Sequence, residues 1–84
     1  YCVPKYPSLI TDLDFSCLND FDGYSNHSPE IIVPITAAIM NSQIIEIHIT
    51  SSKSKDYVDN PVSFDYKELE EMVKLIRISE QIKK

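Results

Sequence analysis

Residues 43–50 read Gln-Ile-Ile-Glu-Ile-His-Ile-Thr, and this stretch decides the kind of fold that the chain can adopt. Ile45, Ile47 and Ile49 alternate with Glu46 and His48. In an extended segment this alternation places isoleucines on one face and a carboxylate and an imidazole on the other. The sequence therefore predicts a β-strand over 43–50 that is buried on one face.

Several shorter elements are predicted on the N-terminal side of this strand and one loop on its C-terminal side. A strand is expected to end within 1–3, before two prolines, and another brief strand is expected within 20–25. Apolar residues at helical spacing predict a short helix over 10–19. Residues 50–60 are rich in Ser, Lys and Asp, which predicts a loop.

The segment Pro29–Asn41 is open to two interpretations. Its isoleucines favour a strand that would pair with 43–50 in a hairpin, whereas Ser28 followed by Pro29 is typical of a helix start. Pro34 is unfavourable in both, because it would be confined to an edge strand or would remove one backbone hydrogen bond from a helix. Local propensity slightly favours the hairpin.

The last segment is predicted to be a helix with two apolar faces. Asp65 and Glu68 have the spacing of a capping box at its start, and Lys83 and Lys84 suit the dipole at its end. The core face holds Leu69, Met72, Val73 and Ile76, and the second face holds Leu75, Ile78 and Ile82. The second face is more apolar surface than one small sheet needs, so we expect part of it to contact something outside these residues.

Length and composition exclude several classes of function. The chain has 84 residues, 13 acidic and 8 basic side chains, a net charge of −5 and one glycine. This acidic balance argues against nucleic-acid binding, and a single glycine excludes glycine-rich phosphate-binding loops. The longest apolar run, residues 31–35, is too short to span a membrane. We expect one small domain or a piece of a larger one, in the cytoplasm, with Cys2 and Cys17 reduced.

His27 and His48 are the two histidines of the chain. If 29–41 is a helix, they follow neighbouring parallel strands, at the edge where α/β folds build their sites. Two imidazoles with added oxygen ligands would suit Mn²⁺ or a similar divalent ion. The alternative is that His27 is a solvated loop residue and His48 pairs with Glu46 on an exposed face. Periodicity and spacing alone do not disclose the function.

Four stretches read together resemble the sialic acid synthase family, which includes N-acetylneuraminate synthase and its pseudaminate and legionaminate relatives. They are Cys2–Ser8 (CVPKYPS), Gly23–Ser28 (GYSNHS), Gln43–Thr50 (QIIEIHIT) and Ser63–Lys84. The resemblance covers nearly the whole chain and matches the last portion of the catalytic barrel. It implies an α/β fold in which residues 1–84 are a fragment of a (β/α)₈ TIM barrel, roughly the last three strand–helix units.

The resemblance also implies how two segments are arranged. It turns 29–41 into a helix, against the local preference. In the strand it directs Ile45, Ile47 and Ile49 toward the outer helices, and Ile44, Glu46 and His48 into the barrel. The second apolar face of the final helix then has neighbours.

The chemistry implied by the resemblance is a condensation. The family joins phosphoenolpyruvate to an N-acetylated amino sugar, such as N-acetylmannosamine, and forms a nine-carbon 2-keto acid with release of phosphate. His27 and His48 match its two metal-binding histidines. Mn²⁺, or another divalent ion such as Mg²⁺, polarises the sugar aldehyde there as a Lewis acid.

Five further residues match positions of the family's site. Ser25 matches a residue near the phosphate of phosphoenolpyruvate, and Tyr6 and Asp59 match positions that contact the sugar. Glu46 is expected to support the ligands or the fold. Asn26 stands where the family usually has an aspartate before the first metal histidine, which removes a charge beside the ligand and would weaken its orientation.

Other departures from the family concern the sugar and the missing parts of the enzyme. Pro4 replaces a polar residue seen in some members, and a Pro-Gly-Pro-Asp stretch reads Asp-Tyr-Val-Asp over 56–59, which leaves the exact sugar open. The lysines that grip phosphoenolpyruvate and a catalytic glutamate come from earlier strands in the family, so these 84 residues alone are expected to be inactive. The family's small antifreeze-like domain, which helps to complete the partner subunit's site, is also absent from this sequence, and the parent protein is expected to be a homodimer.

Two alternatives from other classes stay open at this point. The chain would be an independent small α+β protein-interaction module if 31–50 formed a hairpin edge beside the second face of the final helix. Its acidic first half is also compatible with an inhibitor that mimics nucleic acid. Antiparallel pairing between Ile35 and Ile49 would favour the module, and a helix over 30–41 would favour the barrel.

Overall fold

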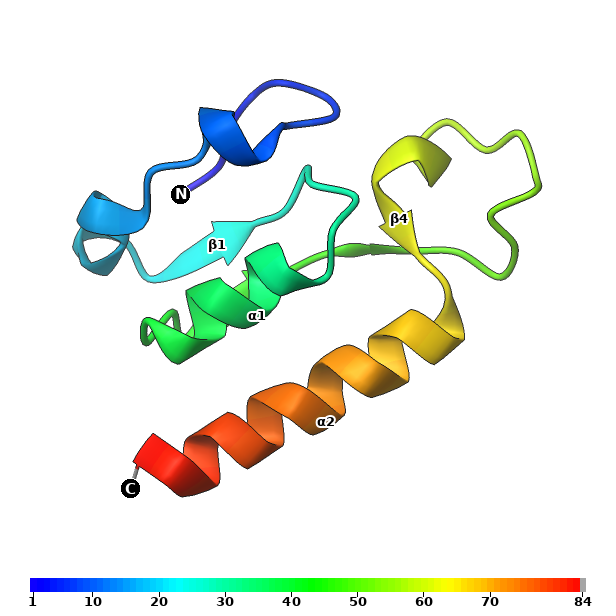
Figure 1. The fold of residues 1–84 in the computed structure, drawn as a ribbon. Coiled ribbons are helices and arrows are strands. Elements are labelled where there is room, and N and C mark those ends of the chain that lie inside the picture. The colour runs from blue at the N-terminus through cyan, green and yellow to red at the C-terminus, as the bar shows by residue number, and fades with distance from the viewer. Residues whose placement is uncertain (84) are drawn as a thin grey trace.

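The computed structural model describes residues 1–83 as an α/β fold, with short parallel strands on one side and two helices on the other (Figure 1). The prediction for Lys84 lies outside the described residues. The elements in chain order are η1 Ile10–Asp12, η2 Phe15–Asp20, β1 Gly23–Ser25, α1 Ile32–Ile39, β2 Ile44–Glu46, β3 His48–Ile49, η3 Asn60–Val62, β4 Ser63–Phe64 and α2 Tyr66–Lys83, where η marks a 3₁₀ helix.

All strand pairs are parallel, and their spatial order follows the chain. Cys2 forms a single bridge with Ser25, and β1 pairs with β2 so that Ser25 lies opposite Glu46. β3 pairs with β4, with His48 opposite Ser63. The strand predicted over 43–50 is therefore divided, because residues 44–46 pair with one neighbour and residues 48–49 with the other. The sequence did not predict β4.

Gly23 allows β1 and β2 to approach each other closely. A Cβ atom at this position would lie 2.8 Å from the Ile44 Cβ and 3.0 Å from its carbonyl carbon. The first distance is shorter than real Cβ contacts allow and the second is unusually tight, and the obstacle includes the backbone of Ile44, which cannot rotate away. The one glycine of the chain therefore stands at a close backbone approach.

The hairpin interpretation of 29–41 is wrong, and the helix that the resemblance implied is confirmed as α1. The helix begins at Ile32 rather than near Pro29. Pro34 thus falls in the first turn, where the backbone N–H would have no partner within the helix, so it costs no hydrogen bond. The helix ends in a Schellman motif: Ser42 N–H binds Ala37 O at 3.0 Å, and Asn41 takes a φ of 74°.

The helix predicted over 10–19 is wrong, because two aspartates divide it. The Asp12 carboxylate accepts a hydrogen bond from Leu9 N–H at 2.8 Å, and Asp14 accepts one from Ser16 N–H at 3.0 Å. Between them Leu13 is extended. Side chains that bind nearby backbone compete with the helical pattern, so only the 3₁₀ helices η1 and η2 remain.

Two apolar clusters make up the core between the strands and the helices. The first contains Leu18, Tyr24, Val33 and Ala37, and the second contains Ile35, Phe64 and Met72. Ile45 packs against the first cluster and Ile47 against the second, as predicted. Ile49 belongs to neither cluster and is 52% exposed, so its predicted orientation toward the helices stays a prediction. Ile44 and Glu46 are exposed on the opposite face of β2.

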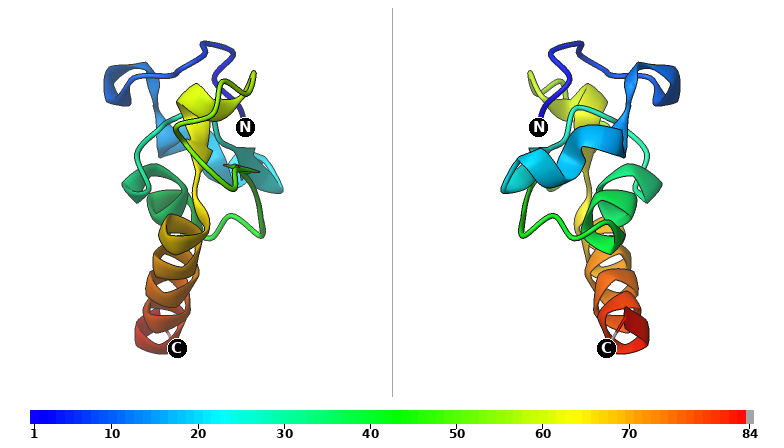
Figure 2. Two further views of the ribbon diagram at one scale, coloured as in Figure 1. Left: turned by 90° about the vertical axis from the view of Figure 1, so that its right-hand side faces the viewer. Right: turned by 90° about the vertical axis from the view of Figure 1, so that its left-hand side faces the viewer.

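The predicted start of α2 is confirmed, and its faces are only partly covered. Asp65 accepts from Glu68 N–H at 2.8 Å, and Glu68 accepts from Asp65 N–H at 3.1 Å, which completes the capping box. On the core face Met72 is buried, but Val73 is exposed, and Leu75, Ile78 and Ile82 of the second face are exposed too. Figure 2 shows that the C-terminal part of α2 extends beyond the rest of the molecule.

Candidate functional site

The two histidines lie together beyond the carboxyl ends of neighbouring parallel strands. His27 follows β1, and His48 follows its neighbour β2 and begins β3. Their ring centroids are 6.1 Å apart. The Tyr6 ring packs edge-on against both, at 5.1 Å from His27 and 6.5 Å from His48. Residues from three distant parts of the sequence therefore meet at one end of the strands.

The ring of His27 is held by a backbone carbonyl. Nδ1 lies 2.9 Å from Val3 O, and because a carbonyl only accepts, Nδ1 must carry the proton and donate it. The lone pair is then on Nε2, the arrangement found in histidines that bind metals. The backbone carbonyl of His27 is also bound, by Ser8 N–H at 2.8 Å. His27 is therefore a partly buried loop residue whose ring is anchored to the backbone of the N-terminal segment.

His48 is partly buried and does not pair with Glu46. Its Nδ1 is buried and has no hydrogen-bond partner among the described residues. Its Nε2 lies 4.0 Å from Asp59 Oδ2, too far for a hydrogen bond. A buried polar atom without a partner is uncommon, and here it belongs to an imidazole beside a second imidazole.

The structure brings together Tyr6 and Asp59, the two residues predicted to contact the sugar. The Tyr6 hydroxyl donates a hydrogen bond of 2.6 Å to Asp59 Oδ1. Partial removal of the hydroxyl from water, the hydrogen bond and the charge of Asp59 together raise the pKa of Tyr6 to about 12. Tyr6 therefore stays protonated and able to donate at neutral pH.

Ser25 and Glu46 form a second polar pair on the exposed face of the strands. The Ser25 hydroxyl donates to Glu46 Oε1 at 2.6 Å, across the β1–β2 pairing. The hydroxyl proton is therefore directed at a carboxylate in this structure. An anionic ligand at Ser25 would have to turn this hydroxyl away from Glu46.

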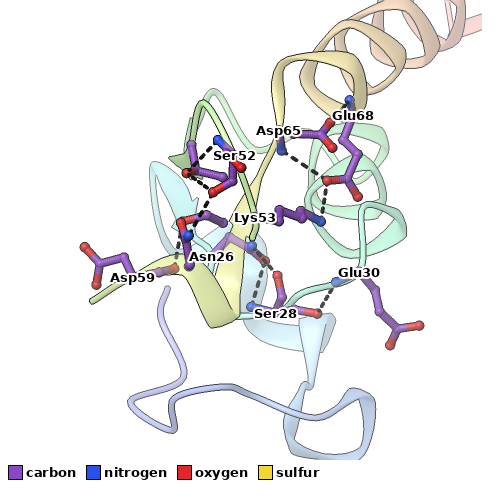
Figure 3. Close-up of polar contacts among 11 residues, drawn as sticks. Asn26, Ser28, Glu30, Ser52, Lys53, Asp59, Asp65 and Glu68 are labelled. Carbon is purple, nitrogen blue, oxygen red and sulfur yellow. Dashed lines mark hydrogen bonds and ion pairs between the residues drawn. The ribbon is translucent and has the colours of Figure 1, made fainter. Parts of the chain in front are cut away.

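Asn26 is buried in the turn that carries His27, where Figure 3 shows it beside Ser28. Its Oδ1 accepts from Tyr24 Oη at 2.9 Å and from Ser28 N–H at 3.2 Å. Its Nδ2 donates to Ser28 O at 2.7 Å. The amide thus fixes the backbone of Ser28, directly after His27, while the ring itself is held by Val3. A missing charge at position 26 therefore does not leave the ring of His27 without a fixed orientation.

Asn60 closes the loop that carries Asp59. Its Nδ2 donates to Ser52 O at 3.0 Å and to Lys55 O at 2.6 Å. At the end of the loop Ser63 Oγ donates to Asp59 O at 2.7 Å. Lys53 forms an ion pair with Glu68 of the capping box, so the loop is also tied to the start of α2 (Figure 3).

Sequence reasoning missed several groups around the site. Tyr24, Asn60 and the carbonyl of Val3 were not singled out, because their roles depend on tertiary contacts that leave no sequence signature. Cys2 was considered only for its redox state. Its sulfur lies 3.8 Å from Nδ1 and 3.9 Å from Nε2 of His27. Both cysteines are free and exposed.

The arrangement can supply part of a metal site but not all of one. The pair of imidazoles, with Nε2 of His27 and the unpaired Nδ1 of His48, fits nitrogen ligation of a divalent ion. Within residues 1–83, no three His, Cys, Asp or Glu side chains gather closely enough to hold a metal ion. In the same range no helix is both long and apolar enough to cross a membrane.

Comparison with known proteins places this geometry in a family. The family model described as "NeuB family" matches residues 1–84. The chain belongs to the NeuB family. Among similar NeuB relatives are the N,N'-diacetyllegionaminic acid synthase of Legionella pneumophila, 32% identical over 98% of this chain, and the pseudaminic acid synthase of Campylobacter jejuni, 30% identical over 94%. The human N-acetylneuraminate-9-phosphate synthase is 26% identical over 95% of the chain.

A solved structure has the same fold over this stretch. The N-acetylneuraminic acid (sialic acid) synthetase of Leptospira borgpetersenii, in complex with citrate, superposes with a TM-score of 0.89 over 96% of this chain at 30% identity. The chain spans only 31% of that structure and about a quarter of the length of the three curated relatives.

Proposed function

We propose that this chain is the C-terminal part of the catalytic barrel of a nonulosonic acid synthase, an enzyme that condenses phosphoenolpyruvate with an N-acetylated amino sugar and releases phosphate. The observation that carries the proposal is the pair His27 and His48, whose rings meet 6.1 Å apart at the carboxyl ends of neighbouring strands. Relatives named as synthases of three nonulosonic acids support the reaction class.

The strand order supports a barrel. Every pairing is parallel, the strands follow one another in chain order, and α1 and α2 lie on the same side of them (Figure 1). A sheet that always advances in one direction with its helices on one side curls toward closure, as in (β/α)₈ barrels. The connection from β3 to β4 is a loop with η3 rather than an α-helix, so the repeat is irregular there.

The exposed apolar surface also supports a larger parent protein. The second face of α2, formed by Leu75, Ile78 and Ile82, is open to solvent in these residues. So are Ile32 and Ile39 of α1 and Ile44 of β2. Monomeric proteins rarely expose this many large apolar side chains, and neighbouring units of a barrel would cover them.

In the proposed enzyme His27 and His48 hold a divalent metal ion, for which we propose Mn²⁺ with Mg²⁺ as the alternative. Such an ion acts as a Lewis acid on the carbonyl group of the sugar. Val3 O fixes the proton on Nδ1 of His27 and leaves Nε2 for ligation. The remaining ligands, the groups that grip phosphoenolpyruvate and the general catalysts come from other strands of the parent protein.

The other site residues have substrate-binding and supporting roles in this proposal. Tyr6 and Asp59, joined by their hydrogen bond, bind hydroxyl or amide groups of the sugar. Ser25 lies near the phosphate of phosphoenolpyruvate, and Glu46 orients its hydroxyl in the absence of that ligand. We also propose that the parent is a cytoplasmic homodimer, where free thiols such as Cys2 persist.

The interaction module, the second candidate from sequence, required a hairpin over 31–50. That segment is instead a helix followed by a strand in a parallel pair, so the edge on which the module depended is absent from the described residues. The module also depended on the exposed second face of α2. That face is present in the structure, but the barrel proposal accounts for it as well.

The proposal is tested with the full-length gene product, whose intact mass should be about four times that of these residues if it resembles the curated relatives. We expect Mn²⁺-dependent release of phosphate from phosphoenolpyruvate with at least one N-acetylated amino sugar. His48→Ala and His27→Ala should each lower this rate by at least about a hundredfold and abolish Mn²⁺ binding measured by calorimetry.

Lys74→Ala provides the control, because Lys74 is exposed on α2 and distant in sequence from the site. Its rate and Mn²⁺ affinity should equal those of the wild type. Unchanged activity in both histidine variants would refute the metal assignment. Failure of every phosphoenolpyruvate-dependent reaction would refute the proposed function.

A further inference from the structure

Tyr24 lies in the core beneath the turn that carries His27. Its side chain is 2% exposed and packs in one cluster with Leu18 and Val33. A phenylalanine would fill the same space, so packing does not require the hydroxyl. The hydroxyl instead donates a hydrogen bond of 2.9 Å to Asn26 Oδ1, which is not part of the apolar cluster.

Asn26 connects the Tyr24 hydroxyl to the backbone next to His27. Its Oδ1 also accepts from Ser28 N–H, and its Nδ2 donates to Ser28 O, so the side chain binds both backbone groups of the residue that follows His27 (Figure 3). An amide oxygen has two acceptor positions. Tyr24 and Ser28 fill both, which fixes the direction in which the amide faces.

The burial of this network makes it rigid. Asn26 and Ser28 are both 0% exposed, so no bulk water can replace a lost hydrogen bond. Burial raises the pKa of Tyr24 to about 12. Tyr24 therefore remains a donor at neutral pH.

We infer that Tyr24 is a positioning residue for the metal-binding imidazole of His27, acting through Asn26 and the backbone of residues 26–28. The inference rests on the proposed function, because it assigns a role toward the metal ion that His27 would hold. Groups that orient a ligating histidine contribute about tenfold to a hundredfold to metal affinity. Tyr24 acts one contact further away, so we expect its hydroxyl to contribute about threefold to tenfold.

The test measures Mn²⁺ binding and the Mn²⁺ dependence of phosphate release in the full-length protein carrying Tyr24→Phe. The dissociation constant, measured by calorimetry, and the half-saturating Mn²⁺ concentration should both rise about threefold to tenfold. Phosphate release should return to the wild-type rate at saturating Mn²⁺. A loss of active protein through instability would instead lower the maximal rate without shifting the half-saturation.

Two matched variants separate positioning from stability. Tyr1→Phe removes a tyrosine hydroxyl that accepts from Asp14 N–H at 3.1 Å, outside the path to His27. Val33→Ala weakens the same apolar cluster without touching the hydrogen bonds of Asn26. Neither should change the Mn²⁺ dissociation constant by more than about twofold.

The outcomes separate this inference from the function on which it rests. If the wild type binds no Mn²⁺ and needs no divalent ion, the proposed function fails and this inference fails with it. If the wild type binds Mn²⁺ and Tyr24→Phe binds it equally well, only the inference is overturned. A shift that Val33→Ala reproduces would also overturn it.

Discussion

The Tyr6 hydroxyl donates a 2.6 Å hydrogen bond to Asp59 Oδ1, across 53 positions of sequence. This contact joins the N-terminal segment to the loop between β3 and η3, and both histidines lie beside it. The two residues that the family resemblance assigned separately to the sugar thus form one unit before any ligand binds.

The raised pKa of Tyr6 gives a prediction at alkaline pH. Because the folded value of about 12 exceeds the ordinary 10.0, the folded protein keeps a proton that the unfolded chain loses. The stabilisation is therefore complete below pH 10 and is lost as the pH rises from 10 to 12. The absorbance change of tyrosine ionisation, compared between wild type and Tyr6→Phe, should place the Tyr6 transition near pH 12.

Asp59→Asn is the matched variant for that titration, since it removes the carboxylate charge and keeps an acceptor oxygen. The Tyr6 transition should move toward lower pH. A transition that stays in place would mean that Asp59 does not set the pKa of Tyr6.

Asn60→Asp should loosen the loop that carries Asp59. The substitution removes both amide donors and leaves Ser52 O and Lys55 O facing a carboxylate oxygen. With Asp59 less well placed in the proposed synthase, the KM for the amino sugar should rise about tenfold, while the KM for phosphoenolpyruvate stays within about twofold. Steady-state phosphate release measures both constants. Asn19→Asp, at an exposed position of η2, serves as the control. An equal rise in the two KM values would contradict a role confined to the sugar.

Gly23→Ala should disrupt the pairing of β1 and β2. The added methyl group would overlap the backbone carbonyl of Ile44, and the strands would have to separate. We expect a loss of about 2–4 kcal/mol in stability, seen as a lower melting temperature or as insoluble protein. Ser51→Ala, at an exposed position, is the control and should melt like the wild type. A wild-type melting temperature for Gly23→Ala would contradict the prediction and would mean that β1 can move away from β2 without cost.

Asp65→Ala should destabilise the start of α2. It removes the acceptor for Glu68 N–H, one half of the capping box, at an expected cost of about 1 kcal/mol. Asp65→Asn keeps an acceptor and should lose only a fraction of that amount. Thermal melts of the two variants give the comparison, and equal melting temperatures would contradict the capping role.

The alternation over 43–50 and the capping box of α2 could be predicted from sequence, because both depend on residues close together in the chain. The division of 43–50 between two partner strands could not be predicted, because Ile47, where the pairing changes, continues the same alternation as Ile45 and Ile49. Only the positions of β1 and β4 decide where each pairing ends. β4 has two residues, too few for any periodic signal.

Local propensity failed where a few polar contacts outweighed it. Pro34 looked unfavourable until its place in the first turn of α1 was known, and Asn41 ends that helix in the role more often taken by glycine. At 10–19 the apolar spacing was helical, but Asp12 and Asp14 bound the backbone instead. The juxtaposition of His27 and His48 followed from the family resemblance, whereas Tyr24 and Asn60 emerged only from their tertiary contacts.

The contact between His27 Nδ1 and Val3 O uses an atom that every amino acid possesses. Substitutions at position 3 can therefore change the side chain and still leave the imidazole tautomer unchanged. The residue that matters for this carbonyl is the next one, because a proline restricts the ψ angle of the residue before it to extended values. Pro4 thereby narrows the directions in which Val3 O can point, and so constrains the orientation of the His27 imidazole through the backbone.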